Sequence, residues 1–214
     1  LKKNNRSIDI IFSVQPRAIF KRGFIGLAKE NVFNLHFAPL PKLRGVQTSS
    51  WAIIDDLKKM GVTLHLIEKR GIDNDPIVAQ KLFPIQKNDT AWSLYNKCVD
   101  HGTALFKSSV LKLIQNRYKS YPQNSALATY HGLNELDYSN LKIPINKTME
   151  ETSRFIRARI FPPAQLPFFI FKGRKMKVKA ISPASTRLSR VLKTAGKNSY
   201  YLPCLDGSLK VSVV

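Results

Sequence analysis

The stretch that decides the fold is FNLHFAPLPKLRG, residues 33–45. An apolar run ends in Asn34-Leu35-His36, and a proline-rich turn and a basic loop follow it. In a β-strand, side chains two positions apart point to the same face of the sheet. Asn34 and His36 are therefore expected to project together from the end of one strand.

A second apolar run brings a carboxylate into the pattern. Residues 61–66 read GVTLHL, and residues 71–77 read GIDNDPI, with Asp73 inside the second motif. We expect an amide, an imidazole and a carboxylate at the ends of two neighbouring strands. These groups suit acyl transfer to an amine, because an amide can donate to an oxyanion and an imidazole can move a proton.

Segments with strand and helix patterns alternate around these motifs. Short runs rich in β-branched residues predict strands at residues 8–14, 32–36, 62–67 and 77–85. Apolar residues at helical spacing predict helices over residues 49–60 and 90–116, and a weaker one, interrupted by two glycines, over residues 19–29. This alternation predicts an α/β fold with a doubly wound, Rossmann-like core that binds ligands at the carboxyl ends of its strands.

The pattern changes near Tyr118, where residues 119–125 form a polar segment typical of a linker. We therefore predict a catalytic domain over residues 1–118 and a C-terminal unit over residues 119–214. The spacing of Thr148 and Glu151 is that of a capping box and predicts a helix after it. Strands are expected at residues 168–171, 176–181 and 209–213, with a tight turn at Asp206-Gly207, so the C-terminal unit should be small and rich in β-structure.

The protein has 214 residues and a formal net charge of +21. Residues 141–214 contain 15 basic and three acidic residues, and residues 172–197 contain nine basic residues and no acidic one. Such a charge attracts anions, whether nucleic acid, anionic lipid or a phosphorylated small molecule, or it is only a solvated face. The charge alone does not identify the partner.

Several classes of protein do not fit the sequence. No apolar stretch is long enough to span a bilayer, and the polar start of the chain is not a signal peptide, so we expect a cytoplasmic protein without a membrane partner. Cys98 and Cys204 lie far apart and are expected to be buried small hydrophobes. No His, Cys and carboxylate cluster has the spacing of metal ligands, so no metal is expected.

Together these motifs resemble the formyltransferase family that uses N10-formyltetrahydrofolate. The resemblance is carried by Asn-x-His, Leu-Pro-Lys-x-Arg-Gly, Gly-Val-Thr and Gly-Ile-Asp, and it extends from about Ile8 to Leu166. It implies that Asn34 donates to the oxyanion. It also implies that His36 acts as a base or stabilises the oxyanion as imidazolium, and that Asp73 orients His36. It further implies a homodimer that uses the C-terminal unit, and a core whose first βα units are missing from this chain.

The resemblance also implies binding residues. The cosubstrate N10-formyltetrahydrofolate is expected to contact two loops, mainly through their backbone: Gln15, Pro16, Arg17, Ile19, Glu68, Arg70, Gly71 and Ile72. The acceptor substrate is expected to contact Lys42, Arg44, Thr48, Ser49, His65, Tyr130 and Arg157. Asp75 stands where the family usually has glycine, which leaves the backbone shape of this loop open.

The choice of acceptor has three alternatives. The pair Thr48-Ser49, the GVTLHL motif and the LDYSNLKI stretch at residues 136–143 resemble the branch that formylates nucleotide-linked amino sugars, such as a dTDP-amino-dideoxyhexose, for surface polysaccharide (O-antigen) synthesis. The basic charge instead favours tRNA and hence a methionyl-tRNA formyltransferase. A non-catalytic module that binds nucleotide or RNA is the third alternative. We expect the sugar enzyme.

Overall fold

The computed structural model describes residues 7–16, 18–68, 71–186 and 192–214. Contacts group the chain into two compact units. The first contains Leu1–Thr48, Lys59–Pro84 and Tyr95–Leu133, and the second contains Ser49–Lys58, Ile85–Leu94 and Asn134–Val214. The chain crosses between the units several times, whereas the sequence predicted one crossing near residue 118. The assignment of catalysis and substrate binding to two domains stays a prediction.

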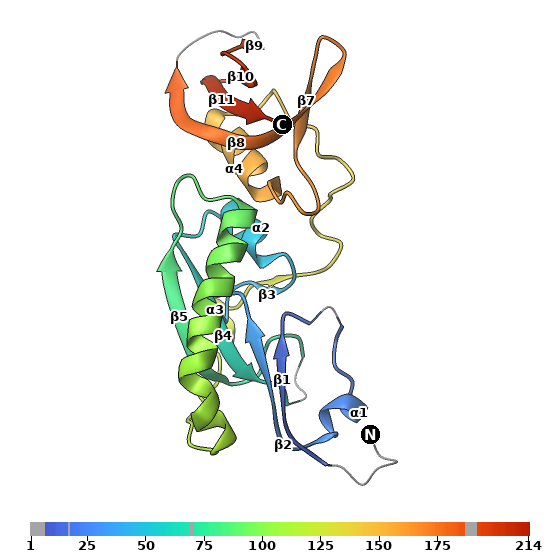
Figure 1. Cartoon of the computed structure of the whole chain (residues 1–214), viewed down its shortest axis with the longest axis vertical. Coiled ribbons are helices and arrows are strands. Elements are labelled where there is room, and N and C mark those ends of the chain that lie inside the picture. The colour runs from blue at the N-terminus through green and yellow to red at the C-terminus, as the bar shows by residue number, and fades with distance from the viewer. Residues whose placement is uncertain (1–6, 17, 69–70, 187–191) are drawn as a thin grey trace. The chain divides into compact units, whose positions relative to one another are not determined.

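A four-stranded sheet forms the centre of the first unit (Figure 1). Its strands, in spatial order, are β1 (Ile8–Val14), β2 (Ala28–His36), β4 (Lys59–Leu66) and β5 (Ile77–Pro84). β1 and β2 run parallel, whereas β4 is antiparallel to both β2 and β5. All four predicted strands are present, and the mixture of sheets and helices confirms the α/β class.

The helix predicted over residues 19–29 is reduced to one turn, α1 (Arg22–Ile25). Gly23 and Gly26 lower the helix propensity of this segment. β2 begins at Ala28, which already pairs with Ile8 of β1. Ala28 and Lys29, which the apolar spacing had assigned to the end of a helix, therefore belong to a strand that pairs with β1.

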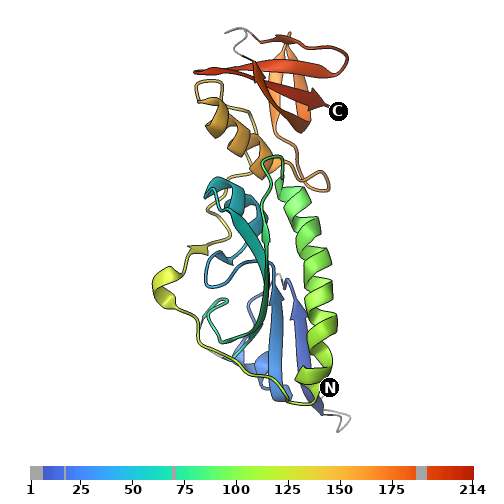
Figure 2. The same cartoon turned by 90° about the vertical axis from the view of Figure 1, so that its left-hand side faces the viewer.

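The two other helices of the N-terminal region start close to the predicted positions. α2 (Thr48–Ile54) is shorter than expected, because β4 already begins at Lys59. α3 (Ala91–Ile114) begins after Thr90, whose Oγ1 accepts a hydrogen bond from the Ser93 N–H at 3.1 Å. Figure 2 shows α3 running along the sheet of the first unit.

α3 packs closely on β2 and on the residues that follow it. A Cβ on Gly102 would lie 3.1 Å from the Phe37 ring and 3.2 Å from Leu35, so this glycine allows the close approach. The core of the sheet holds fully buried side chains such as Phe33, Val62 and Leu64. Burial of each such side chain stabilises the fold by about 1.5–3 kcal/mol.

The second unit is built on an antiparallel five-stranded sheet. Its strands, in spatial order, are β7 (Phe168–Phe171), β8 (Arg174–Thr186), β11 (Gly207–Val213), β10 (Ser199–Cys204) and β9 (Lys193–Thr194). The predicted strands correspond to β7, β8 and β11, whereas β9 and β10 were not predicted. β10 contains Pro203, which weakens a strand pattern, and β9 is only two residues long. The chain turns at Leu205 and Asp206, between the paired residues Cys204 and Gly207.

The helix α4 (Met149–Arg159) packs on this sheet and confirms the predicted capping box. The Thr148 side chain accepts from the Glu151 N–H, and the Glu151 side chain accepts from the Thr148 N–H. The shared core contains Ile156 and Ile160 from the helix region and Val178, Leu202 and Val211 from the sheet. Helix and sheet therefore bury one common hydrophobic cluster.

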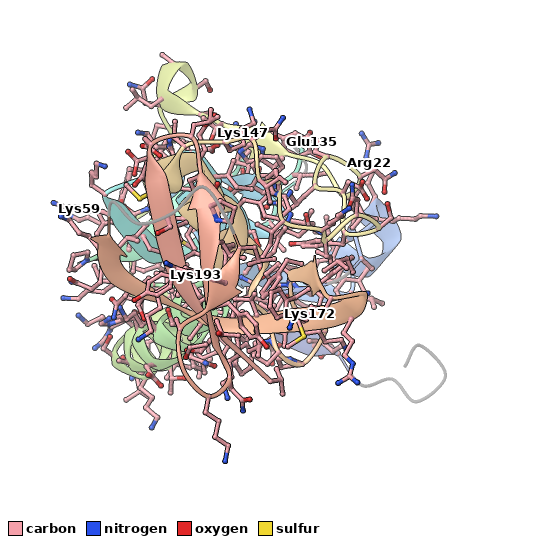
Figure 3. The ribbon with its side chains drawn as sticks, turned by 90° about the horizontal axis from the view of Figure 1, so that it is seen from above. Arg22, Lys59, Glu135, Lys147, Lys172 and Lys193 are labelled. Atoms are coloured by element: carbon pink, nitrogen blue, oxygen red, sulfur yellow. The ribbon has the colours of Figure 1, made fainter. Side chains whose placement is uncertain are left out.

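Lysines are exposed on the sheet of the second unit. Lys175, Lys177 and Lys179 alternate along β8 with Met176 and Val178, the second of which is buried. Figure 3 labels Lys172 and Lys193 among the surface cations of this unit. These lysines face solvent. Of the helices in the described residues, none is both long and apolar enough to cross a membrane.

Candidate active site

Three buried polar side chains lie together where β2 and β4 pair. Asn34 and His36 lie on the same face of β2, and Asn34 is opposite His65 of β4 in the register. Their exposed fractions are 3% for Asn34, 3% for His36 and 1% for His65. Polar groups buried this deeply need hydrogen-bond partners, so the contacts among them determine their orientation.

Asp73 reaches this group from the loop between β4 and β5. β2 and β4 are antiparallel, so their carboxyl ends lie at opposite edges of the sheet. The arrangement differs from the adjacent strand ends expected from a doubly wound core. In the described part of this loop, Gly71 and Asp73 have positive φ angles, of 119° and 51°, and change the direction of the backbone.

The Asp73 carboxylate lies beside all three side chains. Its Oδ2 accepts the Gly45 N–H at 2.9 Å and lies 3.7 Å from His36 Nε2. Its Oδ1 lies 3.5 Å from Asn34 Nδ2 and 3.5 Å from His65 Nε2. The structure therefore brings the predicted trio together and adds His65, which the sequence had placed in the acceptor site.

Gly45 holds the carboxylate from the basic loop. It forms the short strand β3 (Arg44–Gly45), which pairs in parallel with β6 (Tyr130–His131). Its φ of +94° suits glycine, and a Cβ at this position would overlap the carbonyl oxygen of His131. The final glycine of the Leu-Pro-Lys-x-Arg-Gly motif is thus needed for its N–H to face Asp73.

Gln123 clamps the Asp73 loop from the other side. Its Nε2 donates to the carbonyl oxygens of Asp73 and Asp75, each at 2.8 Å. Its Oε1 accepts from the Arg44 guanidinium, at 3.1 Å from Nε and 2.8 Å from Nη2. Gln123 lies outside every sequence motif, in the segment predicted to be a linker, just before the 3-10 helix η2 (Ser125–Leu127).

His36 is oriented by a backbone carbonyl. Its Nε2 lies 3.0 Å from the Leu43 carbonyl oxygen, which can only accept. Neutral His36 therefore carries its proton on Nε2 and keeps Nδ1 able to accept one. Burial lowers the pKa of His36 below its ordinary value, and this outweighs the opposing effect of Asp73. His36 is therefore neutral near pH 7, as a base must be.

Asp73 stays ionised in spite of its burial. Burial by itself raises the pKa of this carboxyl group, and it is the largest single cause. The Gly45 N–H, and the hydrogen bond from His65 and the charge of His36 where these rings carry the proton, act in the other direction, and the net pKa is lowered. The site therefore contains one fixed negative charge between two histidines.

The expected acceptor residues differ in their surroundings. Thr48 is buried and donates to the Phe37 carbonyl oxygen at 2.6 Å, and Ser49 is buried beside it in sequence. Arg157 is also buried, and its Nη1 donates to the Asp89 carbonyl oxygen within the second unit at 3.2 Å. Lys42 and Tyr130 are exposed. Two of the expected acceptor residues lie at the site. His65 contacts Asn34 and Asp73, and Arg44 donates to Gln123, which holds the Asp73 loop.

The expected cosubstrate residues lie on two loops. The Gln15 backbone N–H donates to the Leu35 carbonyl oxygen at 3.4 Å, and its side-chain Nε2 is buried without a hydrogen-bond partner. Pro16 and Ile19 are exposed, and Glu68, Gly71 and Ile72 precede Asp73 in the second loop. Arg17 and Arg70 lie outside the described residues.

Asp75, at the position where the family usually has glycine, does not strain the backbone of its loop. It is buried, and its Oδ2 accepts the Glu68 N–H at 2.9 Å. The left-handed residues of the described loop are Gly71 and Asp73. An aspartate in place of glycine at position 75 therefore causes no backbone strain and adds a hydrogen bond across the loop.

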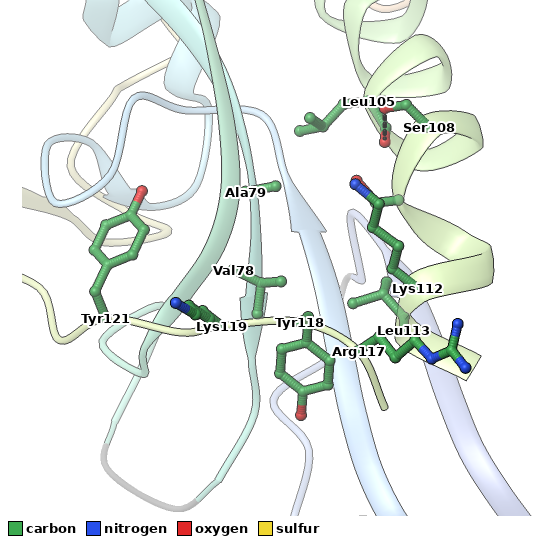
Figure 4. A pocket seen from close by; sticks show the side chains of 11 residues that line it. Val78, Ala79, Leu105, Ser108, Lys112, Leu113, Arg117, Tyr118, Lys119 and Tyr121 are labelled. Atoms are coloured by element: carbon green, nitrogen blue, oxygen red, sulfur yellow. Dashed lines mark hydrogen bonds between the residues drawn. The ribbon is translucent and has the colours of Figure 1, made fainter. Parts of the chain in front are cut away.

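Two cavities of the first unit lie apart from this group. One, of about 520 Å³, lies between β5, the end of α3 and the segment after it, where Lys112, Arg117, Tyr118 and Lys119 surround it (Figure 4). The other, of about 410 Å³, is lined by residues of β2 and by Leu66 to Glu68. Neither is lined by Asn34, His36 or Asp73. Among the described residues, no group of three or more His, Cys, Asp or Glu side chains has the geometry of a metal site.

The chain matches known proteins in sequence over most of its length. The model of the family described as "Formyl transferase" matches residues 4–110. The chain is 27% identical over 204 residues to GDP-perosamine N-formyltransferase of Brucella melitensis, an alignment that covers 92% of this chain and 65% of the relative. The Brucella abortus protein of the same name matches equally. The chain thus spans 65% of the length of these curated relatives.

Solved structures match the chain in both fold and sequence. WlaRD, a sugar 3N-formyltransferase crystallised with dTDP and 5-N-formyl-THF, has a TM-score of 0.80 and 33% identity over 96% of this chain and 72% of its own. An N-formyltransferase from Helicobacter canadensis, in complex with folinic acid and dTDP-3-aminofucose, has a TM-score of 0.78 and 31% identity over 94% and 72%. The resemblance seen in the motifs is confirmed, and the chain belongs to the formyl transferase family.

Proposed function

We propose that this protein transfers the formyl group of N10-formyltetrahydrofolate to the amine of a nucleotide-linked amino sugar. The observation that carries the proposal is the position of the Asp73 carboxylate within 3.7 Å of polar nitrogens of Asn34, His36 and His65. An amide donor, a neutral imidazole and an ionised carboxylate in one buried group are the parts that acyl transfer to nitrogen requires.

The proposed reaction gives each of the three side chains one role. The amine nitrogen attacks the formyl carbon, the carbon–oxygen double bond opens, and the oxygen becomes negative. Asn34 donates a hydrogen bond to this oxygen, which is worth about 10²–10³ in rate for a typical donor. His36 accepts the proton of the attacking amine on Nδ1, and Asp73 stabilises the imidazolium that forms.

The second half of the reaction breaks the original bond to the formyl carbon. The oxygen re-forms its double bond, N10 of the folate leaves with the bonding electrons, and the proton held by His36 is delivered to it. The products are a formamide and tetrahydrofolate, and His36 returns to its neutral form. The proton balance closes without any metal or redox step.

The loops expected at the cosubstrate fit a ligand with several hydrogen-bonding groups. Gln15 Nε2 is a buried donor without a partner, which a ligand carbonyl would satisfy. Gly71 and Asp73 have positive φ angles and turn the backbone of the second loop. The proteins in the two solved structures named above bind 5-N-formyl-THF or folinic acid, which supports the same cosubstrate here.

The relatives favour a sugar as the acceptor. Their names specify GDP-perosamine, a sugar 3-amine and dTDP-3-aminofucose. Methionyl-tRNA stays the alternative, because exposed lysines on the second unit would suit a polyanion. A role in surface polysaccharide synthesis, a homodimer and a cytoplasmic location are further proposals, and light scattering of the purified protein would test the dimer.

The test is a formylation assay with the full-length native protein and N10-formyltetrahydrofolate. The acceptors are dTDP- and GDP-linked sugars with an amine on C3 or C4, with charged methionyl-tRNA as comparison. We expect mass spectrometry to detect the gain of one formyl group on a sugar, and its loss in His36→Ala. His101→Ala is the matched control. It also removes an imidazole, but His101 stacks on Phe83, at a ring-centroid distance of 4.4 Å, and not on a residue of the site.

The remaining outcomes separate the alternatives. Formylation of methionyl-tRNA alone would replace the sugar by tRNA as the acceptor. No formylation of any acceptor by a folded protein would contradict the proposed activity. Equal activity of His36→Ala and the unchanged protein would contradict the proposed role of His36.

A further inference from the structure

The donor group of the Asn34 amide faces two protein side chains. Its Nδ2 lies 3.1 Å from His65 Nε2 and 3.5 Å from Asp73 Oδ1, while its Oδ1 is buried without a hydrogen-bond partner. A carboxamide that stabilises an oxyanion must present N–H rather than C=O. In this orientation both N–H bonds of Asn34 are directed at His65 and Asp73, and none is left for a substrate.

The protonation state of His65 accounts for this orientation. His65 Nδ1 lies 2.7 Å from the Leu66 carbonyl oxygen, which can only accept, so Nδ1 carries a proton. In neutral His65, Nε2 then has a lone pair and accepts from Asn34 Nδ2. A contact in which Asn34 Nδ2 donates to Nε2 requires neutral His65.

Protonation of His65 reverses the preference of the amide. Nε2 becomes a donor, and two donors would then face each other at the His65–Asn34 contact. A half-turn of the Asn34 carboxamide places Oδ1 against Nε2–H and puts the NH2 group where Oδ1 now lacks a partner. Asp73 Oδ1, 3.5 Å from His65 Nε2, offsets the positive charge.

We propose that His65 is a positioning residue whose protonation turns the Asn34 amide into the orientation that donates to the oxyanion. The consequence for catalysis rests on the proposed formyl transfer, whereas the coupling between the imidazole and the amide does not. With neutral His65 the Asn34 N–H groups stay directed at His65 and Asp73, and with charged His65 the turned amide directs them elsewhere.

His65 and His36 share one nearby carboxylate. His36 on β2 faces His65 edge-on, at a ring-centroid distance of 6.3 Å, and Asp73 is the shared carboxylate. The charge of Arg44 is also coupled to Asp73. On β5 the register partner of His65 is the apolar Ile77. With a single carboxylate present, charged His65 and neutral His36 form the combination that the reaction needs.

The first test measures the coupling without turnover. In the full-length protein labelled with ¹⁵N, long-range ¹⁵N–¹H spectra report the tautomer and titration of His65, and the side-chain NH2 signals report Asn34. We expect the Asn34 signals to shift with the same midpoint as His65. They should not follow that midpoint in His65→Gln, and they should be unchanged in His101→Gln, the matched control.

The second test uses the sugar acceptor identified by the assay. Activity should rise with pH as His36 becomes neutral and fall about tenfold per pH unit once His65 loses its proton, which gives a bell-shaped profile. His65→Gln should remove only the falling limb from kcat, because the glutamine NH2 can donate to Asn34 Oδ1 at every pH. The KM of the sugar should stay within about twofold.

The two tests can overturn the inference and the proposed function separately. Asn34 signals that ignore the titration of His65, or that keep the same midpoint in His65→Gln, would overturn the inference. A protein that shows the coupling but formylates no acceptor would support the inference and overturn the proposed function. A falling limb that persists in His65→Gln would overturn the catalytic role of His65.

Discussion

The Gly45 N–H donates to Asp73 Oδ2 at 2.9 Å, and this bond joins the loop after the Asn-x-His motif to the loop that carries the carboxylate. The two motifs are 28 residues apart in sequence. The bond lowers the pKa of Asp73, against the larger opposing effect of burial, and so helps to keep the carboxylate charged.

Gly45→Ala is therefore expected to damage both stability and activity. The added Cβ would overlap the His131 carbonyl oxygen, and φ at this position is +94°. Strain and overlap together should lower the free energy of unfolding by about 2–4 kcal/mol, measured by urea denaturation. The control is Gly173→Ala, at φ +77° with nothing within 4 Å of a Cβ. An equal loss in both variants would contradict a specific role of Gly45.

His36 should make stability depend on pH. Burial lowers the folded-state pKa of His36 below 6.5, so the unfolded state binds the proton more readily. The contribution of neutral His36 is then fully present above about pH 6.5 and is lost as pH falls toward the folded-state pKa. Urea titrations between pH 5 and 8 should show a shallower decline in His36→Gln than in the unchanged protein. Identical slopes would mean that other groups cause the acid destabilisation.

Gln123 is expected to matter although it lies outside every recognised motif. Gln123→Leu removes two partly buried hydrogen bonds to the Asp73 and Asp75 carbonyl oxygens and leaves Arg44 without this acceptor. We expect a loss of about 2–4 kcal/mol in the free energy of unfolding and weaker binding of a formylated folate by calorimetry. Asn124→Ala is the control, because the Asn124 side chain accepts only the Ala126 N–H at an exposed turn. Unchanged folate binding in Gln123→Leu would contradict the clamp.

The sequence predicted those parts of the fold that local periodicity and capping determine. Phe33, Leu64 and Val178 lie in runs whose alternation or apolar content marks a buried strand, and all three are buried as expected. Thr148 and Glu151 determine the start of α4 through two hydrogen bonds within one turn of helix. The structure of residues 19–29 was harder to predict. Their apolar spacing indicates a helix, but the last of them pair with β1, and this long-range contact leaves no local pattern in the sequence.

The grouping of Asn34, His36 and Asp73 was predictable because these residues belong to short motifs, whereas the contacts that orient their side chains are not local. His65 lies opposite Asn34 only because β4 is antiparallel to β2, and strand direction cannot be read from either strand alone. Gln123 joins the site through a single side chain in a polar segment, and such a segment has the composition of a linker. The positive φ of Asp73 likewise arises from the turn of the whole loop.

Asp73→Asn should separate the charge of this residue from its shape. An asparagine keeps the volume and can still accept the Gly45 N–H, but it removes the negative charge beside His36 and His65. We expect kcat/KM to fall by about 10²–10⁴, as for a triad carboxylate, with the fold retained by circular dichroism. Because Asp73 raises the pKa of His36, its removal should also move the acid limb of kcat/KM to lower pH.

Asp9→Asn is the control for Asp73→Asn, because Asp9 forms an exposed ion pair with Lys29 at 3.9 Å, and such pairs contribute little. An acid limb that stays in place in Asp73→Asn would mean that it does not report His36. A shift to higher pH would contradict the electrostatic role, since loss of a nearby negative charge can only make the imidazolium less stable. The direction of the shift thus tests the pairing of Asp73 with His36 even where the loss of rate has several causes.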